Sequence, residues 1–102
     1  MGYPVIMIHG MWCTGANWAR MRALMEPRGY DCHAVSLPAH EPGPGGQAAA
    51  VGAKSLRDYL AFLEDYVAQQ NFREPPIIIG HSMGGLLAQQ LASRINALAL
   101  VL

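Results

Sequence analysis

Short apolar runs alternate with amphipathic segments along this chain, and the alternation predicts strands and helices in turn. Runs rich in Ile, Leu and Val predict four strands, most of them buried on both faces, at residues 5–8, 30–37, 77–79 and 95–102. Apolar residues at helical spacing predict three helices, at residues 17–25, 55–71 and 83–94. Strands and helices in strict alternation predict an α/β fold with a doubly wound parallel sheet of about four strands and helices on both faces.

Capping residues and breakers mark the ends of these elements. Asn17 is the expected N-cap of the first helix. Ser55 and Asp58 have the spacing of a capping box at the start of the second helix. Residues 41–53 are rich in Gly, Pro and Ala and predict a loop. We expect one partial domain that spans residues 1–102.

The strongest chemical signal lies between the third strand and the third helix, where the residues read Gly80-His81-Ser82-Met83-Gly84. This is the G-x-S-x-G pattern of a nucleophile elbow, in the strand-turn-helix context that the motif requires. Gly80 and Gly84 leave room for a sharp turn that raises the Ser82 hydroxyl above the sheet edge. The following helix N-terminus offers the Met83 N–H to a developing oxyanion. Ser82 is therefore the candidate nucleophile.

A second loop, which begins at His9-Gly10 after the first strand, is expected to face the same crevice. If the first and third strands are neighbours, both loops open at one topological switch point. Gly10 lets the backbone turn inward, so that Met11 or Trp12 offers a second oxyanion N–H. We interpret His9 as a brace for the loop rather than a catalyst. Trp12 and Trp18 are interpreted as core residues, with an apolar acyl pocket as the alternative.

These loops resemble those of the α/β-hydrolase fold superfamily. The motifs that carry the resemblance are His9-Gly10, Ser36-Leu37-Pro38-Ala39-His40 and Gly80-His81-Ser82-Met83-Gly84-Gly85. The match is to esterase-, lipase- and lysophospholipase-like serine hydrolases, and it covers essentially the whole chain but only the N-terminal portion of such proteins. The resemblance implies that Ser82 is the nucleophile and that an acid and a histidine follow it later in the chain.

The acid and histidine that the resemblance implies are missing from their expected positions, because no Asp, Glu or His follows Ser82. His40 lies at the correct end of its strand but one strand further out, which makes it a weak substitute. Without a base, the Ser82 hydroxyl is a poor nucleophile. Two hypotheses stay open: a serine hydrolase for ester-type carbonyls in a form that lacks the acid and the histidine, or a non-catalytic remnant or binding module for apolar acyl ligands or a partner chain.

Composition and charge exclude several classes of function. Seven Lys and Arg balance seven Asp and Glu, so the chain lacks the basic excess that nucleic-acid binding requires. The four histidines lack metal-ligand spacing, and neither G-x-G-x-x-G nor a P-loop occurs, so we expect no metal and no cofactor.

Location and self-association can also be predicted from the chain. No apolar run approaches the 18 residues of a membrane span, and no signal peptide is visible. Cys13 and Cys32 are too few for a disulfide scaffold, which favours a reducing, cytoplasmic setting. The apolar strand at residues 95–102 predicts an exposed sheet edge through which the chain associates with itself.

Overall fold

The computed structural model describes residues 2–11, 13–38 and 55–102. The elements in these ranges are β1 (Pro4–Ile8), α1 (Ala19–Met25), β2 (Asp31–Val35), α3 (Leu56–Gln70), β3 (Ile77–Gly80), α4 (Met83–Arg94) and β4 (Ala99–Val101). Two short 3₁₀ helices, η1 (Gly15–Trp18) and η2 (Glu26–Arg28), flank α1. The predicted alternation of strands and helices is confirmed. Among the helices of the described ranges, none has the length and apolarity needed to cross a membrane.

The four strands form one parallel sheet in the order β2-β1-β3-β4. β1 and β3 are therefore neighbours, which meets the condition for their loops to face one crevice, and Ile8 at the end of β1 lies opposite Gly80 at the end of β3. From β1 the chain first adds β2 on one side and later β3 on the other. This reversal is the topological switch point, where α/β proteins open a crevice at the carboxyl ends of their strands.

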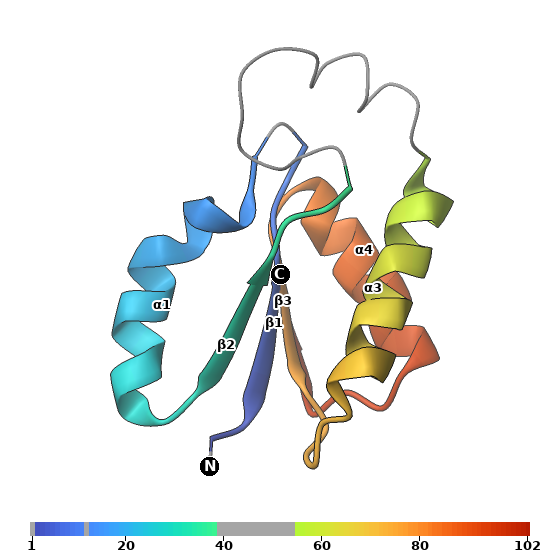
Figure 1. Cartoon of the computed structure of the whole chain (residues 1–102). Helices are drawn as coiled ribbons and strands as arrows, with labels where there is room; N and C mark the ends of the chain where they lie inside the picture. Colours follow the sequence, from blue (N-terminus) through green and yellow to red (C-terminus); the bar gives the residue numbers. More distant parts are fainter. Residues whose placement is uncertain (1, 12, 39–54) are drawn as a thin grey trace.

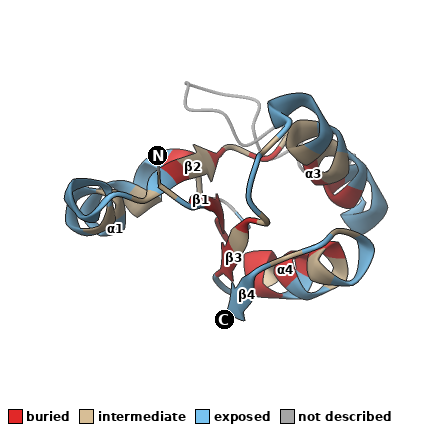
Figure 2. Ribbon diagram, turned by 90° about the horizontal axis from the view of Figure 1, so that it is seen from below, coloured by how far each residue is buried: buried red, intermediate tan, exposed pale blue. Residues whose placement is uncertain are grey.

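Helices cover both faces of the sheet, but unequally: α1 lies on one face, and α3 and α4 lie side by side on the other (Figures 1 and 2). The α3/α4 face holds the larger core, which consists of Ile6, Ile8, Val35, Leu37, Tyr59, Leu60, Leu63, Ile78, Leu87, Ala88 and Leu91. The α1 face holds a smaller core, which consists of Val5, Met7, Cys32 and Ile79. Successive residues of β1 enter opposite cores, which explains why its sequence is apolar without a break.

Capping chemistry at the helix starts confirms one prediction and corrects another. The Ser55 hydroxyl accepts from the Asp58 N–H at 3.2 Å, and the Asp58 carboxylate accepts from the Ser55 N–H at 2.9 Å. The prediction that Asn17 caps the first helix is wrong, because Thr14 is the N-cap of η1. Asn17 is its reciprocal partner and accepts from the Thr14 N–H at 2.8 Å. A capping box needs an acceptor three residues after the cap, and Asn17 supplies it.

Two strands are shorter than predicted. β2 covers Asp31–Val35 rather than 30–37, and β4 covers Ala99–Val101 rather than 95–102. β2 pairs residue by residue with the five residues of β1, so the two strands have the same length. β4 pairs with Ile77–Ile79 only, and β3 continues one residue further, to Gly80. The predicted loop at 41–53 lies outside the described residues.

Candidate active site

Ser82 lies on the turn between β3 and α4, at the carboxyl edge of the sheet. Its backbone has φ 58° and ψ −122°, a left-handed conformation that costs a non-glycine residue about 1–3 kcal/mol. The turn is held by the His81 N–H on the Ile8 carbonyl (3.2 Å), the Gly84 N–H on the His81 carbonyl (2.9 Å) and the Gly85 N–H on the Ser82 carbonyl (2.8 Å). The exposed Ser82 side chain does not cap α4, so its hydroxyl is available at the surface.

Two glycines allow this turn to close against β1. A Cβ atom on Gly80 would fall on the Gly84 carbonyl oxygen. A Cβ atom on Gly84 would fall on the Ile8 carbonyl oxygen and lie 2.5 Å from the His9 carbonyl oxygen. Because backbone atoms of β1 and α4 occupy these positions, a larger residue would push helix and strand apart. The spacing of the two glycines thus has a steric cause.

The N-terminus of α4 begins directly after the serine. The N–H groups in the first turn of a helix have no partner among the helix's own carbonyls, because the carbonyl four residues earlier lies before the helix begins. Gly84 and Gly85 donate instead to the carbonyls of His81 and Ser82. The Met83 N–H stands at the first helical position, where the positive end of the helix dipole lies. This amide is placed to donate a hydrogen bond to negative charge beside Ser82.

The loop after β1 approaches the same serine. A Cβ atom built on Gly10 would lie 3.2 Å from the Ser82 Cβ and 3.7 Å from the His81 Nδ1. Met11 follows as an exposed residue, whereas Trp12 lies outside the described residues. The structure therefore brings the Gly10 backbone to the elbow, as the neighbouring strands predict. The choice between Met11 and Trp12 as a second N–H donor stays a prediction.

His9 is buried, and its two ring nitrogens make different hydrogen bonds. Nε2 lies 3.0 Å from the Leu37 N–H, which can only donate, so Nε2 accepts and carries no proton. Nδ1 then carries the proton and donates to the Gly10 carbonyl at 2.7 Å. In this neutral form His9 joins the loop after β1 to the end of β2. Its nitrogens are engaged within the fold, so it braces the Gly10 loop and does not serve Ser82 as a base.

A cavity of about 320 Å³ opens beside the elbow, lined by His9, Cys13, Asn17, Trp18 and His81. The lining contains no carboxylate, lysine or arginine within the part of the chain that the structure describes. The half-buried Trp18 packs on the α1-face core, as interpreted from the sequence, and also lines this cavity; its role in an acyl pocket stays a prediction. His81, the residue before Ser82, brings the elbow to this cavity.

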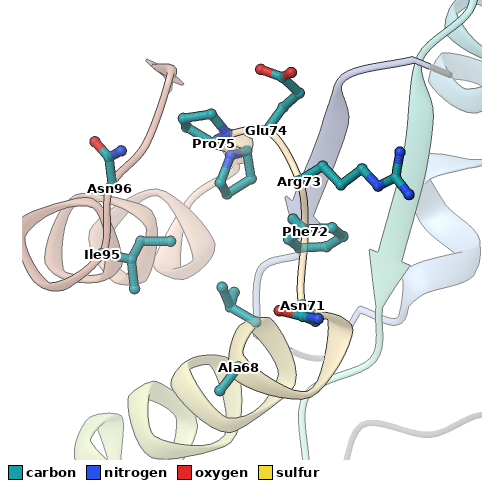
Figure 3. Close-up of a pocket in the computed structure, with 10 residues that line it drawn as sticks. Ala68, Asn71, Phe72, Arg73, Glu74, Pro75, Ile95 and Asn96 are labelled. Carbon is teal, nitrogen blue, oxygen red and sulfur yellow. The ribbon is translucent and has the colours of Figure 1, made fainter.

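Two further cavities lie at the opposite end of the sheet. One of about 330 Å³ is formed by residues 67–76 and 95–96 (Figure 3). Another of about 760 Å³ is formed largely by residues 26–33 and 70–74. The segments that immediately precede β2, β3 and β4 supply much of both linings, so these cavities open at the amino ends of the strands. Ser82 follows a carboxyl end, and neither cavity includes it.

His33 occupies that amino end, in a hydrogen-bonded chain that spacing in the sequence did not reveal. The Asp31 carboxylate can only accept, so the His33 Nε2 donates to it (2.9 Å) and Nδ1 accepts from the Tyr66 hydroxyl (2.6 Å). Burial, with the charge of Asp31, raises the pKa of Tyr66 and keeps the phenol a donor. Phe72 packs edge-on against the His33 ring at 5.0 Å. This chain ties β2 to α3 and lies far from Ser82.

No side chain in the described part of the chain is placed as a hydrogen-bonded base for Ser82. Within residues 2–11, 13–38 and 55–102, no group hydrogen-bonds to the Ser82 hydroxyl. His40, the weak substitute, lies outside these ranges. The same ranges contain no group of three or more His, Cys, Asp or Glu residues that could hold a metal ion. The geometry thus supplies a serine and one adjacent amide donor, with a second loop beside them.

Comparison with known proteins decides the family. Residues 5–102 match the family model described as "Alpha/beta hydrolase family". The chain belongs to the alpha/beta hydrolase family. The resemblance to this family is thereby confirmed, as is the parallel α/β fold.

Relatives in the alpha/beta hydrolase family are considerably longer than this chain. A pyrethroid hydrolase of Sphingobium wenxiniae is 35% identical over 88 residues, which cover 86% of this chain and 30% of the relative. A pimeloyl-[acyl-carrier protein] methyl ester esterase of Chromobacterium violaceum is 33% identical over 104 residues, which cover 98% and 37%. A solved pyrethroid hydrolase superposes with a TM-score of 0.77 at 30% identity, over 98% of this chain and 39% of that one. The chain thus spans less than two fifths of these hydrolases.

Proposed function

We propose that this chain is the nucleophile-bearing portion of a serine hydrolase that acts on carboxylic esters. The observation that carries the proposal is Ser82, which is held at positive φ between β3 and the N-terminus of α4 with its hydroxyl exposed. Strain of this kind persists only where the surrounding structure over-determines it, and it clusters at functional sites. The printed names of a pyrethroid hydrolase and a methyl ester esterase among the relatives support an ester substrate.

In the proposed reaction the Ser82 oxygen attacks the carbonyl carbon of the ester. The carbonyl π electrons move to oxygen, and the oxyanion accepts hydrogen bonds from the Met83 N–H and from an N–H of Met11 or Trp12. The tetrahedral intermediate then expels the alcohol and leaves an acyl group on Ser82, which water removes. One oxyanion donor is worth about 10²–10³-fold in kcat, so the helix N-terminus contributes strongly.

The attack also requires a base that takes the Ser82 proton. Because the described residues offer none, full activity depends on an acid and a histidine from outside them, as the resemblance implies. Oxyanion stabilisation and binding alone retain about 10³–10⁴-fold acceleration over water in serine hydrolases that lack their triad. We therefore expect slow acylation of Ser82 by highly activated reagents even in this chain.

The cavity beside Ser82 supports a neutral, apolar acyl or alcohol group as the part of the ester that is recognised. Trp18 and Cys13 line it, and its described lining carries no carboxylate, lysine or arginine. At about 320 Å³ it is at the lower end of the range of ligand pockets, roughly 300–1,000 Å³. A cytoplasmic setting remains part of the proposal, because Cys13 and Cys32 are both free cysteines.

A second candidate function is a binding module that keeps the crevice and performs no chemistry. The observation that favours it is the missing base at Ser82. A fluorescent apolar acyl ligand distinguishes the two. A binding module binds the ligand without ever forming a covalent adduct, whereas a hydrolase portion is acylated at Ser82.

Labelling with a fluorophosphonate probe tests the nucleophile directly. We expect the chain to be labelled slowly on the peptide that contains Ser82, as read by mass spectrometry, and Ser82→Ala to remain unlabelled. Ser93→Ala is the matched control, because Ser93 is an exposed serine on the same helix whose hydroxyl donates to the Gln90 carbonyl at 2.7 Å. Labelling of the unsubstituted chain no faster than of Ser82→Ala would rule out a competent nucleophile.

A further inference from the structure

Two of the side chains that line the cavity of about 320 Å³ beside the elbow use their hydrogen-bond acceptors within the fold. His9 accepts from the Leu37 N–H with Nε2 and donates to the Gly10 carbonyl with Nδ1. The Asn17 side-chain oxygen accepts from the Thr14 N–H at 2.8 Å, and this contact distinguishes the oxygen from the nitrogen, because a backbone N–H can only donate. The acceptors of His9 and Asn17 are thus engaged by the protein itself.

Trp18 lines the same cavity and contributes an unused hydrogen-bond donor. Its indole Nε1 is buried, and no group within residues 2–11, 13–38 and 55–102 accepts a hydrogen bond from it. An indole nitrogen donates and does not accept. Most buried donors in native proteins have a partner, because a buried N–H without one loses the hydrogen bond that water gives it in the unfolded chain. The Trp18 N–H is therefore a donor that a bound acceptor would satisfy.

Asn17 adds two further donors to the lining. Its Nδ2 carries two N–H groups, and neither makes a hydrogen bond to a described residue. Asn17 and Trp18 are consecutive residues of η1, whose start is fixed by the capping box of Thr14 and Asn17. The remaining lining residues add little to the balance, because the Cys13 thiol is a weak donor and a weak acceptor, and a neutral His81 ring offers one of each. Unused donors therefore outnumber unused acceptors in this lining.

We propose that this cavity is a subsite for a neutral group that carries an acceptor oxygen and no donor, such as a ketone or an ether, in the acyl or alcohol part of the ester. The Trp18 N–H and the Asn17 Nδ2 donate to that oxygen, and the apolar remainder of the group packs on the indole. A carboxylate is disfavoured, because the described lining has no lysine or arginine to offset its charge. The inference rests on the proposed function, since His81, the residue before Ser82, joins the cavity to the elbow.

Two probes that differ in a single group test the subsite. Acetophenone has a carbonyl oxygen where α-methylstyrene has a CH₂ group, and the two molecules are otherwise alike in shape. Binding is followed by NMR of the ¹⁵N-labelled chain, in which Trp12→Phe leaves one indole resonance and so identifies that of Trp18. We expect acetophenone to bind roughly threefold to tenfold more tightly, as one neutral hydrogen bond would give. It should also move the Trp18 N–H proton downfield relative to α-methylstyrene.

Two substitutions remove the donors and keep the local structure. Trp18→Phe keeps an aromatic ring on the α1-face core and removes the N–H. Asn17→Asp keeps an oxygen for the Thr14 N–H and removes both amide donors. Each should bring the ratio of the two dissociation constants to about one, and this ratio cancels any general effect of the substitution on the cavity. Gln69→Glu makes the same amide-to-acid change at an exposed residue of α3 and, as the matched control, should leave the ratio unchanged.

Several outcomes would overturn the subsite. Equal affinity for the two probes would do so, and a preference for acetophenone that survives both substitutions would place the recognition elsewhere. A Trp18 N–H that contacts only an ordered water, seen as a water cross-peak that neither probe displaces, would overturn it as well. If circular dichroism shows that Trp18→Phe does not fold, Asn17→Asp and the shift of the Trp18 N–H in the unsubstituted side chain still decide the question.

A Ser82→Ala variant separates this inference from the proposed function. The subsite does not involve the Ser82 hydroxyl, so the variant should bind acetophenone as tightly as the unsubstituted chain does. A preference for acetophenone without any fluorophosphonate labelling of Ser82 would remove the proposed function and leave the subsite standing. Labelling of Ser82 without any preference between the probes would remove the subsite and leave the proposed function.

Discussion

The two faces of the sheet differ in how completely this chain builds them. On the α3/α4 face, α3 buries Tyr59, Leu60 and Leu63, and α4 buries five residues against the strands. On the α1 face, the seven-residue α1 buries none, and the core consists of three strand residues from β1 and β2 with one from β3. Among the described residues, the α3/α4 face thus holds the larger core and the α1 face the smaller one.

The candidate site straddles the two faces. Its serine and its helix N-terminus belong to α4, which is anchored on the completed α3/α4 face through Leu87, Ala88 and Leu91. The cavity beside the elbow is lined in part by Trp18, which packs on the thinner α1-face core. The reactive geometry is therefore better supported than the surface that would recognise a substrate.

Truncating one large side chain on each face should give the largest difference in the free energy of unfolding between two variants. Leu87 is fully buried and Leu24 on α1 is 62% exposed. We expect Leu87→Ala to lower the free energy of unfolding by about 2–5 kcal/mol through lost burial and a cavity. Leu24→Ala should change it by about 0.5 kcal/mol or less. Urea unfolding followed by circular dichroism measures both, and equal losses would refute the contrast between the faces.

Glycines on α4 provide a finer probe of the same face. Gly84→Ala places a Cβ on the Ile8 carbonyl, and we expect overpacking to cost about 1–3 kcal/mol. At Gly85 an added Cβ would lie at least 3.7 Å from its nearest neighbours. Gly85→Ala should therefore be neutral or stabilise α4 by up to about 1 kcal/mol. Thermal unfolding of the two variants tests the difference in sign, and a destabilised Gly85→Ala would contradict the packing described.

Backbone strain at Ser82 predicts a stabilising substitution within the site. Ser82→Ala keeps a Cβ at φ 58°, whereas Ser82→Gly relieves the left-handed conformation. We expect Ser82→Gly to unfold with a free energy about 1 kcal/mol higher than that of Ser82→Ala. Comparing the two variants by urea unfolding removes any contribution of the hydroxyl. A glycine variant that is less stable than the alanine variant would show that the turn is not strained.

Breaking the hydrogen bond between His33 of β2 and Tyr66 of α3 should change the free energy of unfolding least, and the change should depend on pH. Tyr66→Phe removes the hydroxyl that donates to His33 and should cost about 0.5–1.5 kcal/mol at pH 7. Folding raises the pKa of Tyr66, so its contribution is complete below the pKa of the unfolded phenol, about 10, and is lost as the pH rises through the folded value. The cost of Tyr66→Phe should therefore shrink above about pH 10.

Urea unfolding at pH 7 and at pH 10.5 checks this dependence. Glu26→Ala, which removes an exposed ion pair with Arg22 on α1, is the control from the other face and should cost roughly 0.5 kcal/mol or less. If Tyr66→Phe lowered the free energy of unfolding more at pH 10.5 than at pH 7, the result would contradict a pKa of Tyr66 that folding raises.

Much of this architecture can be predicted from local chemistry. The capping box of Ser55 and Asp58 and the turn glycines around Ser82 are short-range patterns, and each appears in the structure with its expected partners. The approach of Gly10 to Ser82 follows from one long-range inference, that β1 and β3 are neighbours.

What could not be predicted depends on partners distant in the sequence. The length of β2 matches that of β1, its partner in the ladder. The cap at Thr14 depends on Asn17 as its reciprocal partner, and the two residues form one capping box. His33 and Tyr66 meet because β2 and α3 pack together, and no periodicity links positions 33 and 66. A single sequence contains the residues of such contacts but not the geometry that joins them.

The pairing of β1 with β3 also has a consequence for the order of folding. The turn at Ser82 is closed by the Ile8 carbonyl, so positions 8 and 80 must meet before the serine acquires its geometry. Closing so long a loop costs entropy before its contacts are gained, whereas β1, α1 and β2 are close in sequence and pair at lower cost. We expect the serine turn to be among the last parts of the chain to form. A newly made chain would then carry the serine before the turn that strains its backbone exists.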